Sequence, residues 1–261
     1  MGLGEIILTR YSRDPSAPDL VGGVSDWTGT DPWENLTVFP GLKSHIRDSD
    51  VLDFGCGTGA QSVACINAGA RSVVGVDTNP APLASARESV ADHPSRDKIH
   101  FVDRLGSDAA QFDVIISQDA MEHFDHPESI LATWRHALRP SGKVYVTFGP
   151  PWYAPYGAHM HFFTKVPWVN IFFAEETVMR VRSRYRNDGA TRYQDVQGGL
   201  GKMTVGRFER LVKHSGFRVE WSMRQTVKGL PVSRVPLIRE LLTNNIAAVL
   251  CLTEPTRVDE S

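Results

Sequence analysis

The sequence has few cysteines, no long apolar run and no surplus of charge of one sign, and each shortage excludes a class of protein. The three cysteines in 261 residues form no C-x-x-C pair, which argues against a disulfide framework or a structural zinc site. No run approaches the ~18 apolar residues that a membrane span needs. The net charge of −2 creates no global field for nucleic acid or anionic membranes. Because charged residues also appear too early for a signal peptide, we expect a cytoplasmic protein.

The chain does contain a regular alternation of short apolar runs with helix-like segments, which begins at Val51. The predicted strands are residues 51–54, 72–76, 99–102, 112–117, 143–148, 217–223 and 245–252. The predicted helices are residues 60–68, 80–92 with Asn79 as the cap, 127–138, 174–185 and 204–215. This order predicts an α/β fold with a doubly wound, mostly parallel, seven-stranded sheet, whose last strand is antiparallel at or near an edge.

The alternation also suggests a division of the chain into four parts. Residues 1–48 read as an irregular lead-in with one short helix near residues 32–42, and residues 49–149 as the core of the sheet. Residues 150–203 are aromatic-rich and form an inserted cap, and residues 204–261 return to the core. Because the insertion follows the fifth strand, we expect it to cover the carboxyl ends of the strands, where open α/β sheets bind ligands.

A glycine-rich turn joins the first strand to the first helix. Glycines at positions 55, 57 and 59 allow a tight turn and a close approach of a ligand to the backbone. The spacing Gly55-x-Gly57-x-x-Ala60, with Asp77 about twenty residues further on, also satisfies a dinucleotide-binding fingerprint. The turn alone therefore leaves three interpretations open: an S-adenosylmethionine site, a nicotinamide dinucleotide site, or a structural turn with no ligand.

Acidic residues recur where the predicted strands end: Asp53, Asp77, Asp103, Asp119 and Glu122. A dinucleotide brings an anionic pyrophosphate to the start of the helix, and Asp53 would repel it. S-adenosylmethionine has no phosphate and carries a sulfonium and an ammonium. Acids at this edge of the sheet therefore favour the cationic cofactor.

Four motifs carry a resemblance to a known family. Residues 53–59, Asp-Phe-Gly-Cys-Gly-Thr-Gly, resemble the first motif of the class I S-adenosylmethionine-dependent methyltransferases, and residues 74–77 resemble their second. Residues 112–124 resemble the fourth-strand region of small-molecule members, and residues 138–143 resemble the turn before their fifth strand. The resemblance implies a Rossmann-like methyltransferase fold, S-adenosylmethionine as the cofactor and an enzyme that methylates a small molecule.

The resemblance also implies roles for individual residues. Asp77 would accept hydrogen bonds from both ribose hydroxyls, with Thr78 beside it. By its charge, Asp53 would in addition suit the ammonium group, directly or through water. The backbone of Gly55, Cys56 and Gly57 would face the methionine part of the cofactor. Asp103, or a neighbour such as Arg104, would meet the adenine edge, with the Asp103 carboxylate accepting from the amine. Gln118 would lie beside the methionine moiety.

The predicted catalytic residues are histidines. His159 and His161 follow the fifth strand within an aromatic segment and would share a face if that segment is extended. They could supply a general base for a hydroxyl acceptor, hold a metal ion with a third ligand, or simply bond to backbone. His123 is a further candidate near the cofactor or the acceptor. We predict no metal centre.

Four arginines at positions 180, 182, 184 and 186 have two readings. They can complement the dipole at the end of a helix, or form a local patch for an anionic acceptor or RNA. No nucleic-acid module is evident, and we expect neither a nucleic acid nor a membrane as partner. The main hypothesis is methyl transfer to an oxygen, nitrogen or carbon atom of a small molecule. The alternatives are an NAD-dependent oxidoreductase and an inactive scaffold of the same fold, and the oligomeric state stays open.

Overall fold

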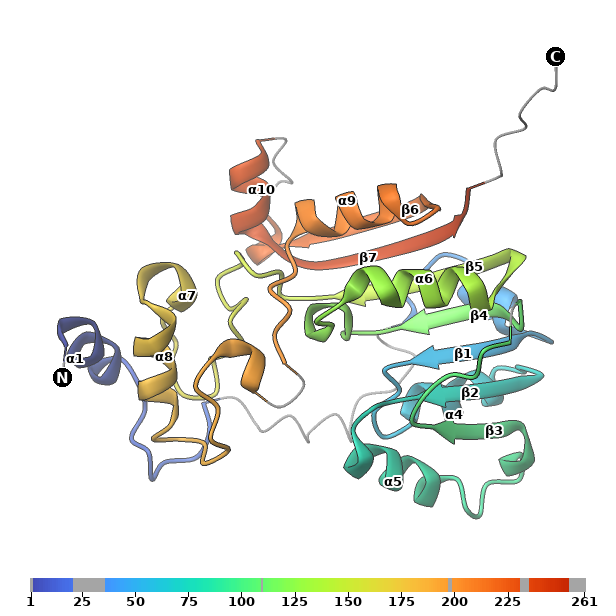
Figure 1. Cartoon of the computed structure of the whole chain (residues 1–261), viewed down its shortest axis with the longest axis horizontal. Coiled ribbons are helices and arrows are strands. Elements are labelled where there is room, and N and C mark those ends of the chain that lie inside the picture. The colour runs from blue at the N-terminus through green and yellow to red at the C-terminus, as the bar shows by residue number, and fades with distance from the viewer. Residues whose placement is uncertain (1, 21–35, 109, 197–198, 231–234, 254–261) are drawn as a thin grey trace.

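The computed structural model describes residues 2–20, 36–108, 110–196, 199–230 and 235–253, and its centre is one seven-stranded sheet (Figure 1). The strands are β1 Asp50–Phe54, β2 Ser72–Val76, β3 Ile99–Val102, β4 Phe112–Ser117, β5 Leu138–Phe148, β6 Phe217–Thr226 and β7 Thr243–Leu252. Their spatial order is β3-β2-β1-β4-β5-β7-β6. The predicted fold is therefore confirmed.

The first five strands run parallel, and β7 is antiparallel to both β5 and β6. β7 thus lies one strand in from the edge, as the sequence suggests, and β6 forms the edge itself. Because parallel strands all end on the same side, the carboxyl ends of β1 to β5 form one continuous rim. The crossover from β3 to β4 reverses the strand order beside β1, which is the position where open α/β sheets bind ligands.

Helices cover both faces of the sheet. They are α3 Leu42–Ile46, α4 Ala60–Asn67 and α5 Pro80–Ser89 on one face, and α6 Pro127–Ala137 and α9 Val205–His214 on the other, with α10 Pro236–Leu242 before β7. Neighbouring residues on β1 serve opposite faces: Val51 packs in the first core and Leu52 in the second. A strand buried on both faces reads as a continuous apolar run, and this is the pattern that marks β1 in the sequence.

The cap has a hydrophobic core of its own, separate from the two cores of the sheet. It contains α7 Val169–Phe172, α8 Glu175–Arg182 and a short 3₁₀ helix, η4 Tyr193–Asp195. Figure 1 shows these elements beyond the carboxyl ends of the parallel strands, where the insertion is expected to lie. Phe163, Val178 and Tyr193 are buried in this core.

One part of the lead-in differs from the expectation. Residues 3–10 form a helix, α1 Leu3–Arg10, which packs against α8 and contributes the buried Leu8 to the core of the cap. The sequence offers little local signal for it, because Gly2 supplies no capping side chain and tertiary contact stabilises the helix instead. Of the short helix expected near residues 32–42, the part up to residue 35 lies outside the described residues, and α3 begins only at Leu42.

Arginines of α8 and of the turn that follows it hold α1 and the neighbouring loops in place. Arg182 is buried and forms a bidentate pair with Asp188 at 2.7 and 2.6 Å. Arg184 contacts Glu5 of α1 at 2.5 Å, and Arg186 pairs with Asp19. Arg180 also lies 3.6 Å from Glu5. All four arginines are therefore engaged by acids within the chain, which favours their structural reading over a patch for an anionic acceptor or RNA.

Within the described part of the chain, no helix combines the length and the apolarity that crossing a membrane requires.

Candidate cofactor and active site

The glycine turn after β1 is built so that only glycine fits two of its positions. Gly55 and Gly59 have φ angles of +84° and +82°, a region that side chains disfavour. A Cβ at Gly55 would lie 2.9 Å from the Cβ of Ala120, and one at Gly59 would lie 2.5 Å from the ring of Phe101. The turn therefore packs tightly against Phe101 of β3 and against Ala120, which follows β4.

Asp77 fixes this turn to the end of β2. Its Oδ2 accepts a hydrogen bond from the amide of Gly57 at 2.9 Å, and its Oδ1 accepts one from the amide of Asn79 at 2.8 Å. Asn79 in turn caps α5 by accepting from the amide of Ala81 at 3.2 Å, as predicted. Two backbone amides thus orient the carboxylate, and its remaining lone pairs can still accept from a ligand.

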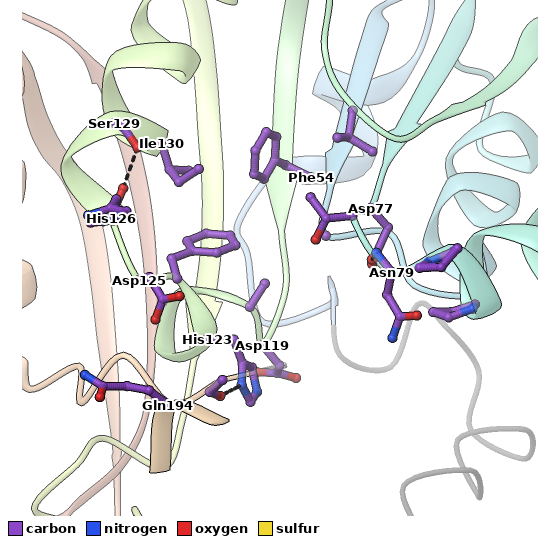
Figure 2. A pocket seen from close by; sticks show the side chains of 18 residues that line it. Phe54, Asp77, Asn79, Asp119, His123, Asp125, His126, Ser129, Ile130 and Gln194 are labelled. Carbon is purple, nitrogen blue, oxygen red and sulfur yellow. Dashed lines mark hydrogen bonds between the residues drawn. The ribbon is translucent and has the colours of Figure 1, made fainter. Parts of the chain in front are cut away.

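A cavity of about 710 Å³ opens between the strand ends and the cap (Figure 2). Residues that line it come from the ends of β1, β2 and β4, from the start of α6 and from the cap: Phe54, Gly55, Val76, Asp77, Thr78, Asn79, Pro80, Pro82, Asp119, Ala120, His123, Phe124, Asp125, His126, Ser129, Ile130, Gln194 and Gly199. A cavity of this size can hold a nucleoside cofactor.

Three amides at the start of the turn already donate hydrogen bonds to the end of β2. Those of Gly55 and Cys56 donate to the carbonyl of Val76 at 2.8 and 3.0 Å, and that of Gly57 donates to Asp77. A pyrophosphate needs such amides free at the start of the helix. The geometry therefore gives no support to the dinucleotide reading in this part of the turn.

Asp53 lies behind the turn and does not line the cavity. Its side chain is only 2% exposed, and its Oδ2 accepts from the hydroxyl of Ser62 on α4 at 2.6 Å. Burial raises the pKa of Asp53 to about 6, and the nearby charge of Asp77 adds to the increase. The carboxylate of Asp53 therefore has no direct path to the cofactor ammonium. Its predicted role remains an effect on the ammonium through the turn or through a water molecule.

The four other predicted cofactor residues lie in four different environments. Thr78 lines the cavity beside Asp77. Cys56 is buried, and burial raises the pKa of its thiol, so only its backbone can serve. Asp103 is 68% exposed in its side chain, is absent from the cavity wall and lies 3.8 Å from Arg104. Gln118 lines a second cavity, and its Oε1 accepts from Gln61 at 3.3 Å.

Asp119 and Glu122 after β4 occupy different environments. Asp119 reaches the main cavity, whereas Glu122 is 3% exposed and lies beneath the surface. Burial raises the pKa of Glu122 to about 8, and the nearby Asp119 adds to the increase. Its Oε1 accepts from the amide of Gly149, where the cap begins, at 3.1 Å, and its backbone carbonyl accepts from Gly201, where the cap ends, at 2.7 Å.

The two ends of the cap are therefore fastened to one short segment, the 3₁₀ helix η3 Met121–His123. A further bond joins the ends directly, from the amide of Trp152 to the carbonyl of Met203 at 2.7 Å. Gly201 permits the contact, because a Cβ there would lie 2.3 Å from the carbonyl oxygen of Phe124. The same segment lines the cofactor cavity through His123, so cap and cavity share one support.

His123 is the predicted histidine that the structure places in the cavity wall. Its Nδ1 lies 2.7 Å from the carbonyl oxygen of Gly199. A carbonyl can only accept, so Nδ1 carries the proton and Nε2 keeps its lone pair. A histidine in this tautomer can act as a general base toward a ligand. Figure 2 shows its ring next to Asp119.

His159 and His161 lie outside the described wall of that cavity. Residues 151–163 form a series of turns rather than an extended strand, and His159 has a φ angle of +54°, so the condition for a shared face is not met. The ring centroid of His159 lies 5.5 Å from that of His123. Burial lowers the pKa of His159 to about 3 and also lowers that of His161. Among the described residues, no three His, Cys, Asp or Glu side chains are grouped to hold a metal ion.

Several residues of the cavity wall lie beyond what the sequence reasoning identified. Gln194 and Gly199 come from the cap, more than seventy residues after β4. Phe124 follows the Met121–His123 segment, and Ser129 and Ile130 lie in the first turn of α6, so their place after β4 could have indicated them. The cap residues carry no local signal, because only the folding of the insertion brings them over the strand ends.

Comparison with known proteins agrees with this geometry. Residues 52–146 match the family model described as a methyltransferase domain. Among curated proteins, the chain is 33% identical over 106 residues to the ribosomal protein L11 methyltransferase of Thermotoga petrophila, which covers 40% of each chain. It is 35% identical over 111 residues to the ubiquinone biosynthesis O-methyltransferase of Nitrosococcus oceani, which covers 40% of this chain and 46% of the relative. The matched region thus spans less than half the length of these relatives.

Solved structures extend the likeness to most of the chain. An S-adenosylmethionine-dependent methyltransferase from Mesorhizobium loti superposes with a TM-score of 0.56 at 20% identity, over 85% of this chain and 98% of the other. At this identity the match shows the fold. Residues 52–146 thus match a methyltransferase domain, and the chain as a whole has the fold of an S-adenosylmethionine-dependent methyltransferase.

Proposed function

We propose that this protein transfers the methyl group of S-adenosylmethionine to an oxygen, nitrogen or carbon atom of a small molecule. The observation that carries the proposal is the Asp77 carboxylate, which two backbone amides hold at the wall of the main cavity. A carboxylate fixed in this way suits the two ribose hydroxyls of the cofactor, because charge-assisted hydrogen bonds are the stronger kind. The cytoplasmic location and the four-part division of the chain remain proposals as well.

The choice of a small acceptor over a protein rests on the cap. Gln194 and Gly199 of the cap line the same cavity as Asp77, so a bulky acceptor has to approach the cofactor past the cap. The curated relatives include methyltransferases named for a protein and for ubiquinone biosynthesis, and the position of the cap favours the second kind. Methyl transfer itself needs mainly alignment of the nucleophile and exclusion of water.

Calorimetry with S-adenosylmethionine, S-adenosylhomocysteine and NADH tests the cofactor. We expect the first two ligands to bind and NADH not to bind. Release of S-adenosylhomocysteine should then be measured with panels of small acceptors and with protein acceptors. Turnover on a small acceptor supports the proposal, tight binding of NADH alone would make the chain an oxidoreductase, and cofactor binding without turnover on any acceptor would make it a scaffold.

We predict that His123→Gln lowers kcat by about 100-fold on a hydroxyl or amine acceptor, since a positioned general base contributes roughly that much or more. Glutamine keeps a donor for the Gly199 carbonyl and loses the base. The affinity for S-adenosylhomocysteine should stay within about twofold. His100→Gln, an exposed change on β3, is the control, and equal kcat values for wild type and H123Q would rule out the base role.

A further inference from the structure

A second cavity, of about 610 Å³, lies beside the first at the carboxyl ends of β4 and β5. Its described wall also includes the end of β6 and the start of β7: Val38, Gln118, Asp119, Thr147, Met223, Arg224, Gln225, Thr226, Gly229 and Asn245. Asp119 lines both cavities. The two spaces therefore meet at this carboxylate.

The backbone of Asp119 is held in an uncommon conformation. Its φ angle is +47°, which is unfavourable for a residue with a side chain. Its amide donates to the Thr147 carbonyl at 3.0 Å, and the Thr147 hydroxyl donates to its Oδ1 at 3.1 Å. Asn245 on β7 lies in the same wall, and its side chain acts to lower the pKa of the carboxyl. Thr147 of β5 thus fixes the carboxylate between the two cavities.

The charge of Asp119 has no matching cation in the described structure. No described Lys or Arg side chain forms an ion pair with it. Arg224 in the same wall is bonded to Glu209 of α9 at 2.7 Å, and Glu209 also contacts Arg239. Burial raises the pKa of Asp119, against the opposing effects of Thr147, Asn245 and His123. A carboxylate that is partly removed from water and has no counter-ion is costly, and a cation in the cavity would relieve that cost.

We propose that this second cavity, the Asp119 cavity, binds the methyl acceptor and that the acceptor carries an amine. The inference rests on the proposed methyltransferase function and names its substrate class. The ammonium would contact Asp119, while Met223 and Val38 offer apolar surface to its carbon skeleton. An anionic head group would face Asp119 without a free cation to receive it.

The chemistry balances with groups already described. The ammonium first loses one proton, to Nε2 of His123 or to water. The free nitrogen then forms a bond to the methyl carbon as the bond from sulfur to that carbon breaks. The bonding electrons stay on sulfur, which leaves as the neutral thioether S-adenosylhomocysteine, and the product is a methylated ammonium ion.

The test compares three probes that share one skeleton: benzylamine, benzyl alcohol and benzoate. Their affinities are measured by calorimetry with and without saturating S-adenosylhomocysteine. We expect benzylamine to bind at least about tenfold more tightly than benzyl alcohol, with benzoate the weakest. In Asp119→Asn this preference should disappear while the affinity for S-adenosylhomocysteine holds. Asp97→Asn, an exposed change before β3, is the matched control.

Three results would overturn the inference: similar affinities for the three probes or no binding of any of them, a preference for the amine that survives in D119N, or an equal loss of S-adenosylhomocysteine affinity in D119N. The last result would assign Asp119 to the cofactor. Failure of wild type to bind S-adenosylhomocysteine would instead defeat the proposed function. The probe series without cofactor still tests the cavity in that case.

Discussion

Asp77→Ala is expected to weaken the binding of S-adenosylmethionine and S-adenosylhomocysteine by at least about tenfold, since a lost charged hydrogen bond costs roughly 1.5–3 kcal/mol. The carboxylate serves two purposes at once. It would accept from the ribose hydroxyls, and it holds the amides of Gly57 and Asn79 at 2.9 and 2.8 Å. Removing it therefore loosens the turn as well as the ligand contact. Calorimetric titration measures the change.

Two further variants separate the loss of the ribose contact from the loosening of the glycine turn. Asp77→Asn keeps an oxygen that can accept from one amide but loses the charge, so its affinity should fall between those of wild type and D77A. Asp92→Ala, an exposed change after α5, should leave the affinity unchanged. If D77A binds the cofactor as tightly as wild type does, the ribose role is excluded.

Glu122→Gln is expected to stabilise the protein, and more so as the pH rises. Burial raises the pKa of Glu122 to about 8 in the folded state, against about 4.3 for an ordinary glutamate. Between these two values the folded protein holds a proton that the unfolded chain releases, so the free energy of unfolding falls as the pH rises and levels off above about pH 8. The free energy of unfolding lost through Glu122 approaches ~5 kcal/mol in total. Glutamine carries no titrating proton, so E122Q avoids this loss.

Urea denaturation at pH 6 and pH 9 measures this effect. The difference between E122Q and wild type should grow by about 3 kcal/mol between the two pH values, from roughly two pKa units at 1.36 kcal/mol each. Asp53, with a pKa of about 6, also lowers the free energy of unfolding as the pH rises. Its contribution is the same in E122Q and wild type, so it cancels in the difference between them. Glu128→Gln, on the exposed side of α6, is the control. Parallel curves for E122Q and wild type would contradict the prediction.

The sheet and the cofactor turn could be predicted because local patterns encode them. Apolar runs such as residues 51–54 mark strands that are buried on both faces, and the glycines at 55 and 59 are required by their positive φ angles and close neighbours. The strand-end position of Asp77 follows from the same patterns. The structure confirms the fold. Asp77 and Thr78 lie in the cavity wall, and their contacts with the cofactor stay predictions.

The features that the sequence did not predict depend on contacts between distant segments. α1 forms because Glu5 and Leu8 meet α8 about 175 residues later in the chain, and the sequence near Gly2 contains no signal that predicts a helix. Asp53 and Asp103 both end strands, yet one is buried behind the turn and the other is exposed. A period of two along a strand cannot decide between those outcomes, because the loop that follows sets the direction of the last side chain.

The fastening of both ends of the cap to Met121–His123 has a consequence for how new specificities can arise. Because the two ends of the cap are held side by side, the cap is a loop that is closed at its ends. Lengthening such a loop changes the free energy of loop closure little, since each doubling of its length adds only about 0.6 kcal/mol. Transplanting residues 150–200 from a distant homologue should therefore disturb the sheet little, provided that Gly149 and Gly201 keep their bonds to Glu122. α1 has to travel with the graft, because Glu5 is the partner of its arginines.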